Sequence, residues 1–180
     1  MPPPVSLLLD KDVVRHLLVG LDRELAGRTP AVDRQRTALT LFRQIAKRSV
    51  STQIARETWN ILARRHSVTV VNLFLPHVSP LDRGRYFRRW ARRLTEHGFT
   101  YEDAKTLSNA CFGVDRAGER LGVDLVVTCD ERMLHNYQTH FPVLSVRLDR
   151  MARQLPLPYR NVGLPEVLTL DQAVSRLMAA

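Results

Sequence analysis

Two short apolar runs in this chain each end on an aspartate. The first run, Val5–Leu9, is followed by Asp10, and the second, Leu125–Cys129, is followed by Asp130. Apolar runs of this length, bounded by polar residues, are typical of strands that are buried on both faces of a sheet. Because ligands of open α/β sheets bind outside the carboxyl ends of the parallel strands, we expect the two aspartates to lie at one site.

The rest of the hydrophobic pattern predicts alternating helices and strands. Helical spacing of apolar residues is expected to give helices at residues 11–21, 33–47, 51–65, 79–97 and 171–178, with a further helix from Thr100 and a short one at 131–137. Short apolar or β-branched runs predict strands at residues 68–75, 142–146 and 167–168. This alternation indicates an α/β fold with a parallel sheet in one domain.

The charge balance suggests a polyanionic partner. The 180 residues include 27 Lys and Arg against 18 Asp and Glu, which gives a formal net charge of +9 and a pI near 10.5. Such an excess favours a nucleic acid, because phosphate contacts release counterions and steer association. The alternative is a solvated helix face without a ligand. The candidate nucleic-acid-binding residues are Arg85, Arg88, Arg89, Arg92 and Arg93.

Composition narrows the class of protein further. The contents of 44% hydrophobic and 25% charged residues are ordinary for a globular domain, and no apolar stretch approaches the roughly 20 residues of a membrane span. Residues 1–4 lack the features of a signal peptide. The two cysteines form no CxxC pair and the six histidines show no metal-ligand spacing, so no zinc site is expected. We expect a cytoplasmic protein without a membrane partner.

Four acids occupy comparable places in the predicted elements. Asp10 and Asp130 follow strands, Glu57 lies on the apolar side of a predicted helix, and Asp103 is the third residue after Thr100 in a capping-box pattern. A cluster of carboxylates suits Mg²⁺, which prefers oxygen ligands. Each acid also has a structural alternative. The three aspartates can cap helices, and Glu57 can pair with an arginine.

The order of these elements resembles that of the PIN-domain nucleases. The matching segments are LLLDKDVV (residues 7–14), VSTQIARETWNIL (50–62), YEDAKTLSNA (101–110) and DLVVTCD (124–130). The resemblance implies a three-layer α/β/α sandwich and a metal-dependent ribonuclease that hydrolyses RNA with a metal-activated water. It implies a nuclease domain at residues 1–149 and a C-terminal extension, 150–180, packed on it. It also implies that Mg²⁺ or Mn²⁺ is held by the catalytic residues Asp10, Glu57, Asp103 and Asp130, with Thr128 as an accessory residue.

The chain departs from the family pattern at three places, one of which is a tail beyond about Asp149 that is longer than a minimal toxin needs. Asp12 stands where the family usually has Asn, and an apparent insertion at residues 113–122 leaves Asp115 as an alternative to Asp103. Many PIN domains are toxins that pair with an antitoxin and often dimerise, and some have lost activity. The resemblance therefore implies RNA as the substrate, with an antitoxin or a second copy of the chain as further partners. The alternative function is an inactive RNA- or protein-binding module.

Overall fold

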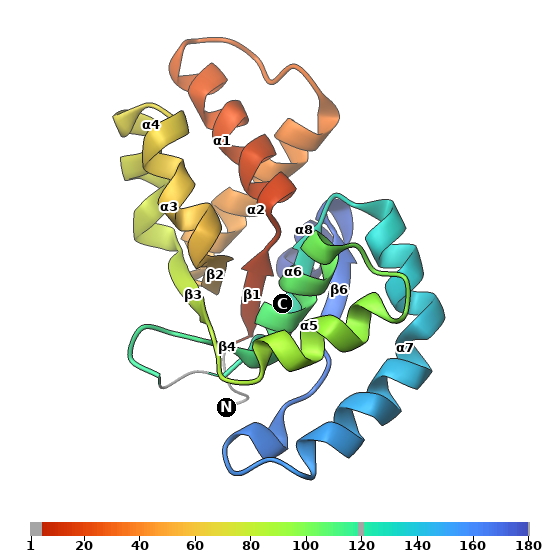
Figure 1. Cartoon of the computed structure of the whole chain (residues 1–180). Coiled ribbons are helices and arrows are strands. Elements are labelled where there is room, and N and C mark those ends of the chain that lie inside the picture. The colour runs from red at the N-terminus through yellow and green to blue at the C-terminus, as the bar shows by residue number, and fades with distance from the viewer. Residues whose placement is uncertain (1–4, 119–120, 180) are drawn as a thin grey trace.

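The central sheet is the middle layer of a three-layer α/β/α sandwich (Figure 1). The computed structural model describes residues 5–118 and 121–179. Six strands follow the order β4-β3-β2-β1-β5-β6, and in this part of the chain only β3 and β4 pair antiparallel. The predicted fold class, an α/β sandwich with a mainly parallel sheet, is therefore confirmed. The strands are β1 (Ser6–Leu9), β2 (Ser51–Ala55), β3 (Ser79–Arg83), β4 (Gly113–Val114), β5 (Leu125–Thr128) and β6 (Glu166–Thr169).

Helices cover both faces of the sheet, with α1 to α4 on one side and α5 to α7 on the other (Figure 1). The first face carries α1 (Lys11–Leu25), α2 (Asp33–Arg48), α3 (Arg56–Arg65), α4 (Val68–Phe74) and α8 (Leu170–Ala179). The second face carries α5 (Phe87–Thr95), α6 (Tyr101–Phe112) and α7 (Glu131–Ala152). Two 3-10 helices, η1 (Leu75–His77) and η2 (Tyr159–Asn161), lie between these elements.

Alternate residues of the central strands supply the two hydrophobic cores. Leu7 and Leu9 of β1 pack into the core beneath α1 and α2, whereas Leu8 points into the core beneath α5 and α6. All four residues of β1 are buried, as expected for a parallel strand that is covered on both faces. The apolar runs around β1 and β5 therefore reflect burial on two sides.

The register of the parallel strands aligns their carboxyl ends. Leu9 pairs with Ile54 of β2 on one side and with Val127 of β5 on the other. The backbone N–H of Asp10 donates to the carbonyl of Val127 at 3.0 Å, which extends the β1–β5 pairing by one residue. The chain segments that follow these three strands consequently emerge at the same edge of the sheet.

Two predicted helices are wrong in their first part. Residues 51–55 form β2 and residues 79–83 form β3, while helix begins only at Arg56 and Phe87. The polar residues of both segments suggest helices. In the structure, β2 pairs with β1 along one edge and with β3 along the other. Pairing in the sheet thus overrides local helical periodicity, because strand preference depends strongly on tertiary neighbours.

Two predicted strands are wrong throughout. Residues 68–75 form α4 and part of η1, and residues 142–146 lie within the 22-residue helix α7. In α4 the buried positions Val70, Val71 and Phe74 follow helical spacing, and Ser67 caps the helix by accepting the Val70 N–H. A short apolar run does not by itself separate a strand from a helix that is buried on one side.

The C-terminal part of the chain extends the same sheet. After α7 and η2, β6 pairs parallel with β5 and α8 packs against the first core. The predicted strand at 167–168 and helix at 171–178 are confirmed within one to two residues. None of the helices in residues 5–118 and 121–179 combines the length and apolarity of a membrane span.

The turn from β3 into α5 contains a glycine that the backbone of α6 approaches closely. We expect Gly84→Ala to lower the free energy of unfolding by about 1–3 kcal/mol, because the added Cβ would overlap the carbonyl oxygen of Phe112. Urea denaturation measures the loss against Gly163→Ala, where an added Cβ meets no atom within 4 Å. Equal stability of the two variants would contradict this account of the turn.

Candidate active site

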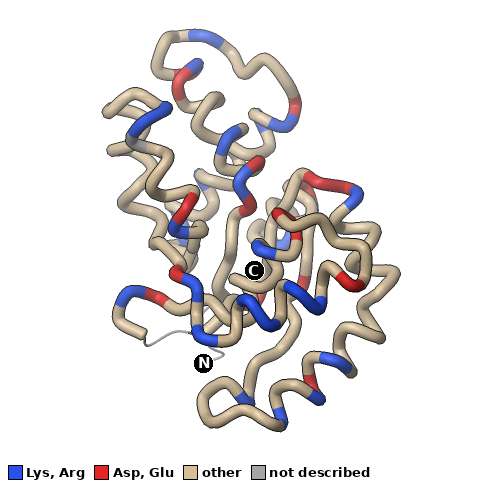
Figure 2. Tube along the Cα trace, viewed as in Figure 1, with Lys and Arg blue, Asp and Glu red and all other residues tan. Residues whose placement is uncertain are grey.

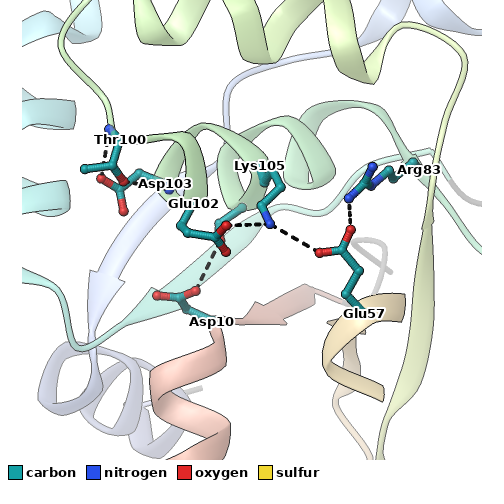
Figure 3. A network of polar contacts seen from close by, with 8 residues as sticks. Asp10, Glu57, Arg83, Thr100, Glu102, Asp103 and Lys105 are labelled. Atoms are coloured by element: carbon teal, nitrogen blue, oxygen red, sulfur yellow. Dashed lines mark hydrogen bonds and ion pairs between the residues drawn. The ribbon is translucent and has the colours of Figure 1, made fainter. Parts of the chain in front are cut away.

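A cavity of about 460 Å³ opens at the carboxyl ends of the central strands. Its walls include all four acids that the sequence singles out, namely Asp10, Glu57, Asp103 and Asp130. Figure 3 shows three of them, Asp10, Glu57 and Asp103, reaching this region from separate elements. The fold therefore brings to one cavity four carboxylates whose positions in the sequence are spread over more than half of the chain.

Both carboxylate oxygens of Asp10 accept hydrogen bonds. Oδ1 accepts from the backbone N–H of Lys11 at 2.8 Å and from Thr106 Oγ1 at 3.1 Å, and Oδ2 accepts from Thr128 Oγ1 at 3.0 Å. Asp10 is also the N-cap of α1, so the structural alternative for this residue is present as well. The carboxylate thus has a defined orientation at the tip of the central strand.

Thr128 connects the two aspartates that follow β1 and β5. Its hydroxyl donates to Asp10 Oδ2 at 3.0 Å and accepts the backbone N–H of Asp130 at 3.0 Å. Asp130 in turn caps α7, because its Oδ1 accepts the backbone N–H of Met133 at 2.9 Å. Thr128 is only 1% exposed, so water competes little with this link between the two strand ends.

Asp103 forms the predicted capping box at the start of α6. The Thr100 hydroxyl accepts the Asp103 N–H at 3.2 Å, and Asp103 Oδ2 accepts the Thr100 N–H at 3.3 Å. Burial raises the pKa of the Asp103 carboxyl, hydrogen bonds with Thr100 oppose this rise, and the charge of Asp130 adds to it. The two carboxylates therefore interact repulsively across the cavity.

Burial also raises the pKa of Asp10. The hydrogen bonds from Thr128, Lys11 and Thr106 lower this pKa in part, and the nearby charge of Asp12 raises it slightly. Removal of a carboxylate from water disfavours its charged form, and a neighbouring cation favours it. Asp10 is therefore a carboxylate whose ionisation a bound cation would stabilise, a property that is common at functional sites.

Glu57 lies at the other end of the cavity and is engaged by two cations (Figure 3). Its Oε1 pairs with Arg83, and its Oε2 accepts from Lys105 Nζ at 3.3 Å. Lys105 also pairs with Glu102 at 2.7 Å. The structural alternative for Glu57, a partnership with an arginine, is therefore observed together with its place on the cavity wall.

Four residues of α6 belong to the cavity although the sequence did not single them out, namely Glu102, Lys105, Thr106 and Asn109. Lys105 and Asn109 both line it, and Asn109 is 5% exposed with a buried Oδ1 that has no hydrogen-bond partner among the residues that the structure describes. One signal was available for them. Lys105 and Asn109 are four residues apart and therefore share a side of the helix, which is not the side of Asp103, because a step of two residues does not bring side chains together. Only the tertiary structure shows that this side faces Asp10.

The two alternative acids have different surroundings. Asp12 lines the cavity and forms an ion pair with Arg15 at 3.5 Å. Asp115 follows β4, which runs antiparallel to β3, and its carbonyl accepts the N–H of Gly118 at 3.0 Å in a turn. Asp103, and not Asp115, is among the residues on the cavity wall. Positions 119 and 120 of the predicted insertion lie outside the described residues.

The chemistry of the cavity wall fits a hard cation. Across residues 5–118 and 121–179, no three His, Cys, Asp or Glu side chains lie close enough to hold a metal ion in their present positions. The available donors are nevertheless oxygens, from the carboxylates of Asp10, Asp103 and Asp130 and from the unpartnered amide oxygen of Asn109. These are the donors that Mg²⁺ and Mn²⁺ favour.

The predicted nucleic-acid-binding arginines lie along α5 and in the turn before it. Arg85, Arg88 and Arg92 are exposed, whereas Arg89 and Arg93 are partly buried. Figure 2 shows the resulting row of Lys and Arg positions along α5. Trp90, on the opposite side of the helix, is completely buried in the second core. The helix therefore presents its positive charge outward and its aromatic ring to the core.

Comparisons with known proteins identify no relative of the chain. No family model, curated protein or solved structure matches it. The resemblance to PIN domains therefore depends on the four sequence segments.

We expect Asp10→Asn to raise the melting temperature at pH 7 in the absence of divalent metal. Because the folded pKa of Asp10 lies above its unfolded value, the folded state binds the proton more tightly and loses stability as pH rises between the two values. Asparagine caps a helix as well as aspartate does and carries no charge. Thermal unfolding in EDTA near pH 4 and at pH 7 should show that the advantage of the variant shrinks at the lower pH.

Asp149→Asn is the control for this experiment, because it makes the same substitution at an exposed aspartate. A lower melting temperature of Asp10→Asn at pH 7 would show that the buried charge does not limit stability.

Proposed function

We propose that the chain is a metal-dependent ribonuclease that hydrolyses RNA phosphodiester bonds. The observation that best supports this function is the hydrogen-bonded link from Asp10 through Thr128 to Asp130, which adjoins a cavity also lined by Asp103. Carboxylates at this edge of a parallel sheet suit a hard cation together with a phosphate ester. The exposed arginines of α5 favour a polyanionic substrate.

The residues with the best claim to hold Mg²⁺ or Mn²⁺ are Asp10, Asp103 and Asp130. When bound, the ion would supply activation of water and neutralisation of charge on the phosphodiester. The hydroxyls of Thr106 and Thr128 orient Asp10 through its two oxygens. The chain thereby sets the direction of the central carboxylate before any ligand arrives.

The proposed reaction is an in-line displacement at phosphorus. The oxygen of a water molecule forms the new bond to phosphorus while the bond to the 3′-oxygen breaks, and the 3′-oxygen leaves with a proton. The products are 5′-phosphate and 3′-hydroxyl ends. Asn109 Oδ1 is a buried acceptor on the wall that is available to orient the water or a ribose hydroxyl.

The basic surface of α5 would hold the RNA strand outside the cavity. Arginine suits this task because its planar guanidinium donates two parallel hydrogen bonds to a phosphate. Arg83, at the end of β3, pairs with the cavity acid Glu57 and shortly precedes α5 in the chain. The charged surface and the cavity are therefore linked through a short stretch of sequence.

Asp10→Asn and Asp130→Asn are each expected to lower kcat for RNA cleavage by about 100-fold or more, because changes at residues around a metal commonly cost 10–100-fold even outside its direct ligands. Cleavage of a labelled single-stranded RNA with Mn²⁺ or Mg²⁺ measures the effect. Asp103→Asn should show a similar loss, and Asp115→Asn should retain nearly wild-type activity. Wild-type rates for the Asp10 and Asp130 variants would refute the proposed site.

The double variant Arg88→Ala/Arg92→Ala is expected to weaken RNA binding and to lower the salt dependence of the affinity. Each lost phosphate contact to a single strand removes about 0.7 from the slope of log K against log salt. Fluorescence anisotropy across a salt series measures the slope. Arg64→Ala/Arg65→Ala, which removes the same charge from exposed positions at the end of α3, should leave the slope near its wild-type value.

A second candidate function is a module that binds RNA or a partner protein without turnover. The pairing of Glu57 with Arg83 and Lys105 favours it, since these cations already neutralise one acid of the set. Such a module would bind RNA equally well in EDTA and would show no cleavage with any divalent metal. Metal-dependent cleavage that Asp10→Asn abolishes would exclude it.

A further inference from the structure

Lys105 occupies an unusual place for a lysine. Its side chain is only 15% exposed, and its ammonium lies 2.7 Å from Glu102 Oε1 and 3.3 Å from Glu57 Oε2. The same ammonium lies 5.0 Å from the centre of the Tyr101 ring, a distance typical of a cation–π contact. Lysines are rarely buried without partners, and here the partners hold the positive charge on the cavity wall.

Arg83 completes this arrangement from the end of β3. It pairs with the second oxygen of Glu57 and lies 5.0 Å from the centre of the Phe87 ring. Arg56 donates to both carboxylate oxygens of Asp82 at 2.8 and 2.7 Å, and this pair ties the start of α3 to β3. Glu57, the next residue after Arg56, is thereby held between two cations.

The charge of the cavity makes these cations necessary for an anionic substrate. Six carboxylates and two lysines are among the described residues of its walls. A phosphodiester that approached the acids alone would be repelled, and one divalent ion offsets only part of this negative charge. Lys11 is exposed at the rim, so Lys105 is the partly buried lysine that a phosphate within the cavity would meet.

We propose that Lys105 is a phosphate-binding residue of this site, with Arg83 beside it, and that Glu57 positions the two cations without being a metal ligand. This inference rests on the proposed ribonuclease function. Both oxygens of Glu57 already have cationic partners, whereas Asp10, Asp103 and Asp130 have none at comparable distance in the contacts described above. The three aspartates thus stand apart from an ion-paired cluster in which Lys105 and Arg83 contact Glu57 and Glu102, and Figure 3 shows this cluster beside Asp10.

The first test measures RNA binding by anisotropy in Ca²⁺, with the RNA checked on a gel to remain uncut. Lys105→Met should raise Kd at least fivefold and lower the salt slope by about 0.7, the value for one phosphate contact on a single strand. Lys105→Arg should bind within twofold of the wild type. Lys47→Met, which removes an exposed lysine of α2, should change neither quantity.

A charge-balanced variant separates direct contact from simple charge. Lys105→Met/Glu102→Gln removes one positive and one negative group, so the net charge of the cavity is unchanged. If Lys105 contacts the phosphate, this variant should bind RNA as weakly as Lys105→Met. Recovery of wild-type affinity and salt slope would overturn the proposed contact. Circular dichroism at the assay temperature shows whether the variant is folded, so that unfolding is separated from the loss of a contact.

The role of Glu57 is tested by Mn²⁺ binding without RNA, measured by calorimetry. Glu57→Gln should leave the Kd for Mn²⁺ within twofold of the wild type, whereas Asp10→Asn should raise it at least tenfold. A tenfold rise for Glu57→Gln would show that Glu57 is a ligand and overturn its positioning role. Cleavage assays should show a loss of kcat for Glu57→Gln despite intact metal binding.

These results distinguish failure of the inference from failure of the proposed function. If the wild type cleaves RNA with Mn²⁺ but Lys105→Met retains its affinity and salt slope, the phosphate-binding role is wrong and the ribonuclease remains. If the wild type cleaves no RNA with any divalent metal, the proposed function is wrong, and the inference that rests on it falls as well.

Discussion

Partial burial of the Asp10 carboxylate at the tip of the central strand is the constraint on which this site depends. The chain accommodates the charge by surrounding it with donors from three elements, namely Lys11, Thr106 and Thr128. The same contacts tie α1, α6 and β5 to one point, so the geometry of the cavity and the packing of the sheet are coupled. A carboxylate that served only as a helix cap would not need to be buried among other acids, because caps function well at exposed positions.

The fold could be predicted from the sequence where local and tertiary preferences agree. β1 and β5 are mostly apolar and are completely buried, so their residues indicate strands without knowledge of their neighbours. The Thr100 capping box is a local signal and is confirmed. In contrast, Ser51–Ala55 has a polar sequence that becomes a strand because it pairs with strands on either side. The amphipathic helix α4 differs from a strand mainly in the spacing of its buried residues.

The acids on the cavity wall could be singled out from the sequence because Asp10 and Asp130 follow apolar runs and Asp103 belongs to a capping box. Their partners could not, since the contacts cross long separations in sequence. Lys105 meets Glu57 across 48 residues, and no helical or strand periodicity reports a contact of that kind. The resemblance to PIN domains likewise directs attention to carboxylates and is silent on Lys105. The ion pairs of Lys105 are therefore visible only in three dimensions.

The direction of the helices has a further consequence for the site. Within the described residues, α1, α3, α6 and α7 all contribute residues of their first turn or N-cap to the cavity wall. Helix amino termini carry a partial positive charge from their unpaired backbone N–H groups. The main chain itself therefore offsets part of the repulsion among the carboxylates, before any side chain or ion contributes. If one aspartate is neutralised, less negative charge remains to offset the positive potential of the helix amino termini. The affinity for metal should then fall, and the attraction for phosphate should rise.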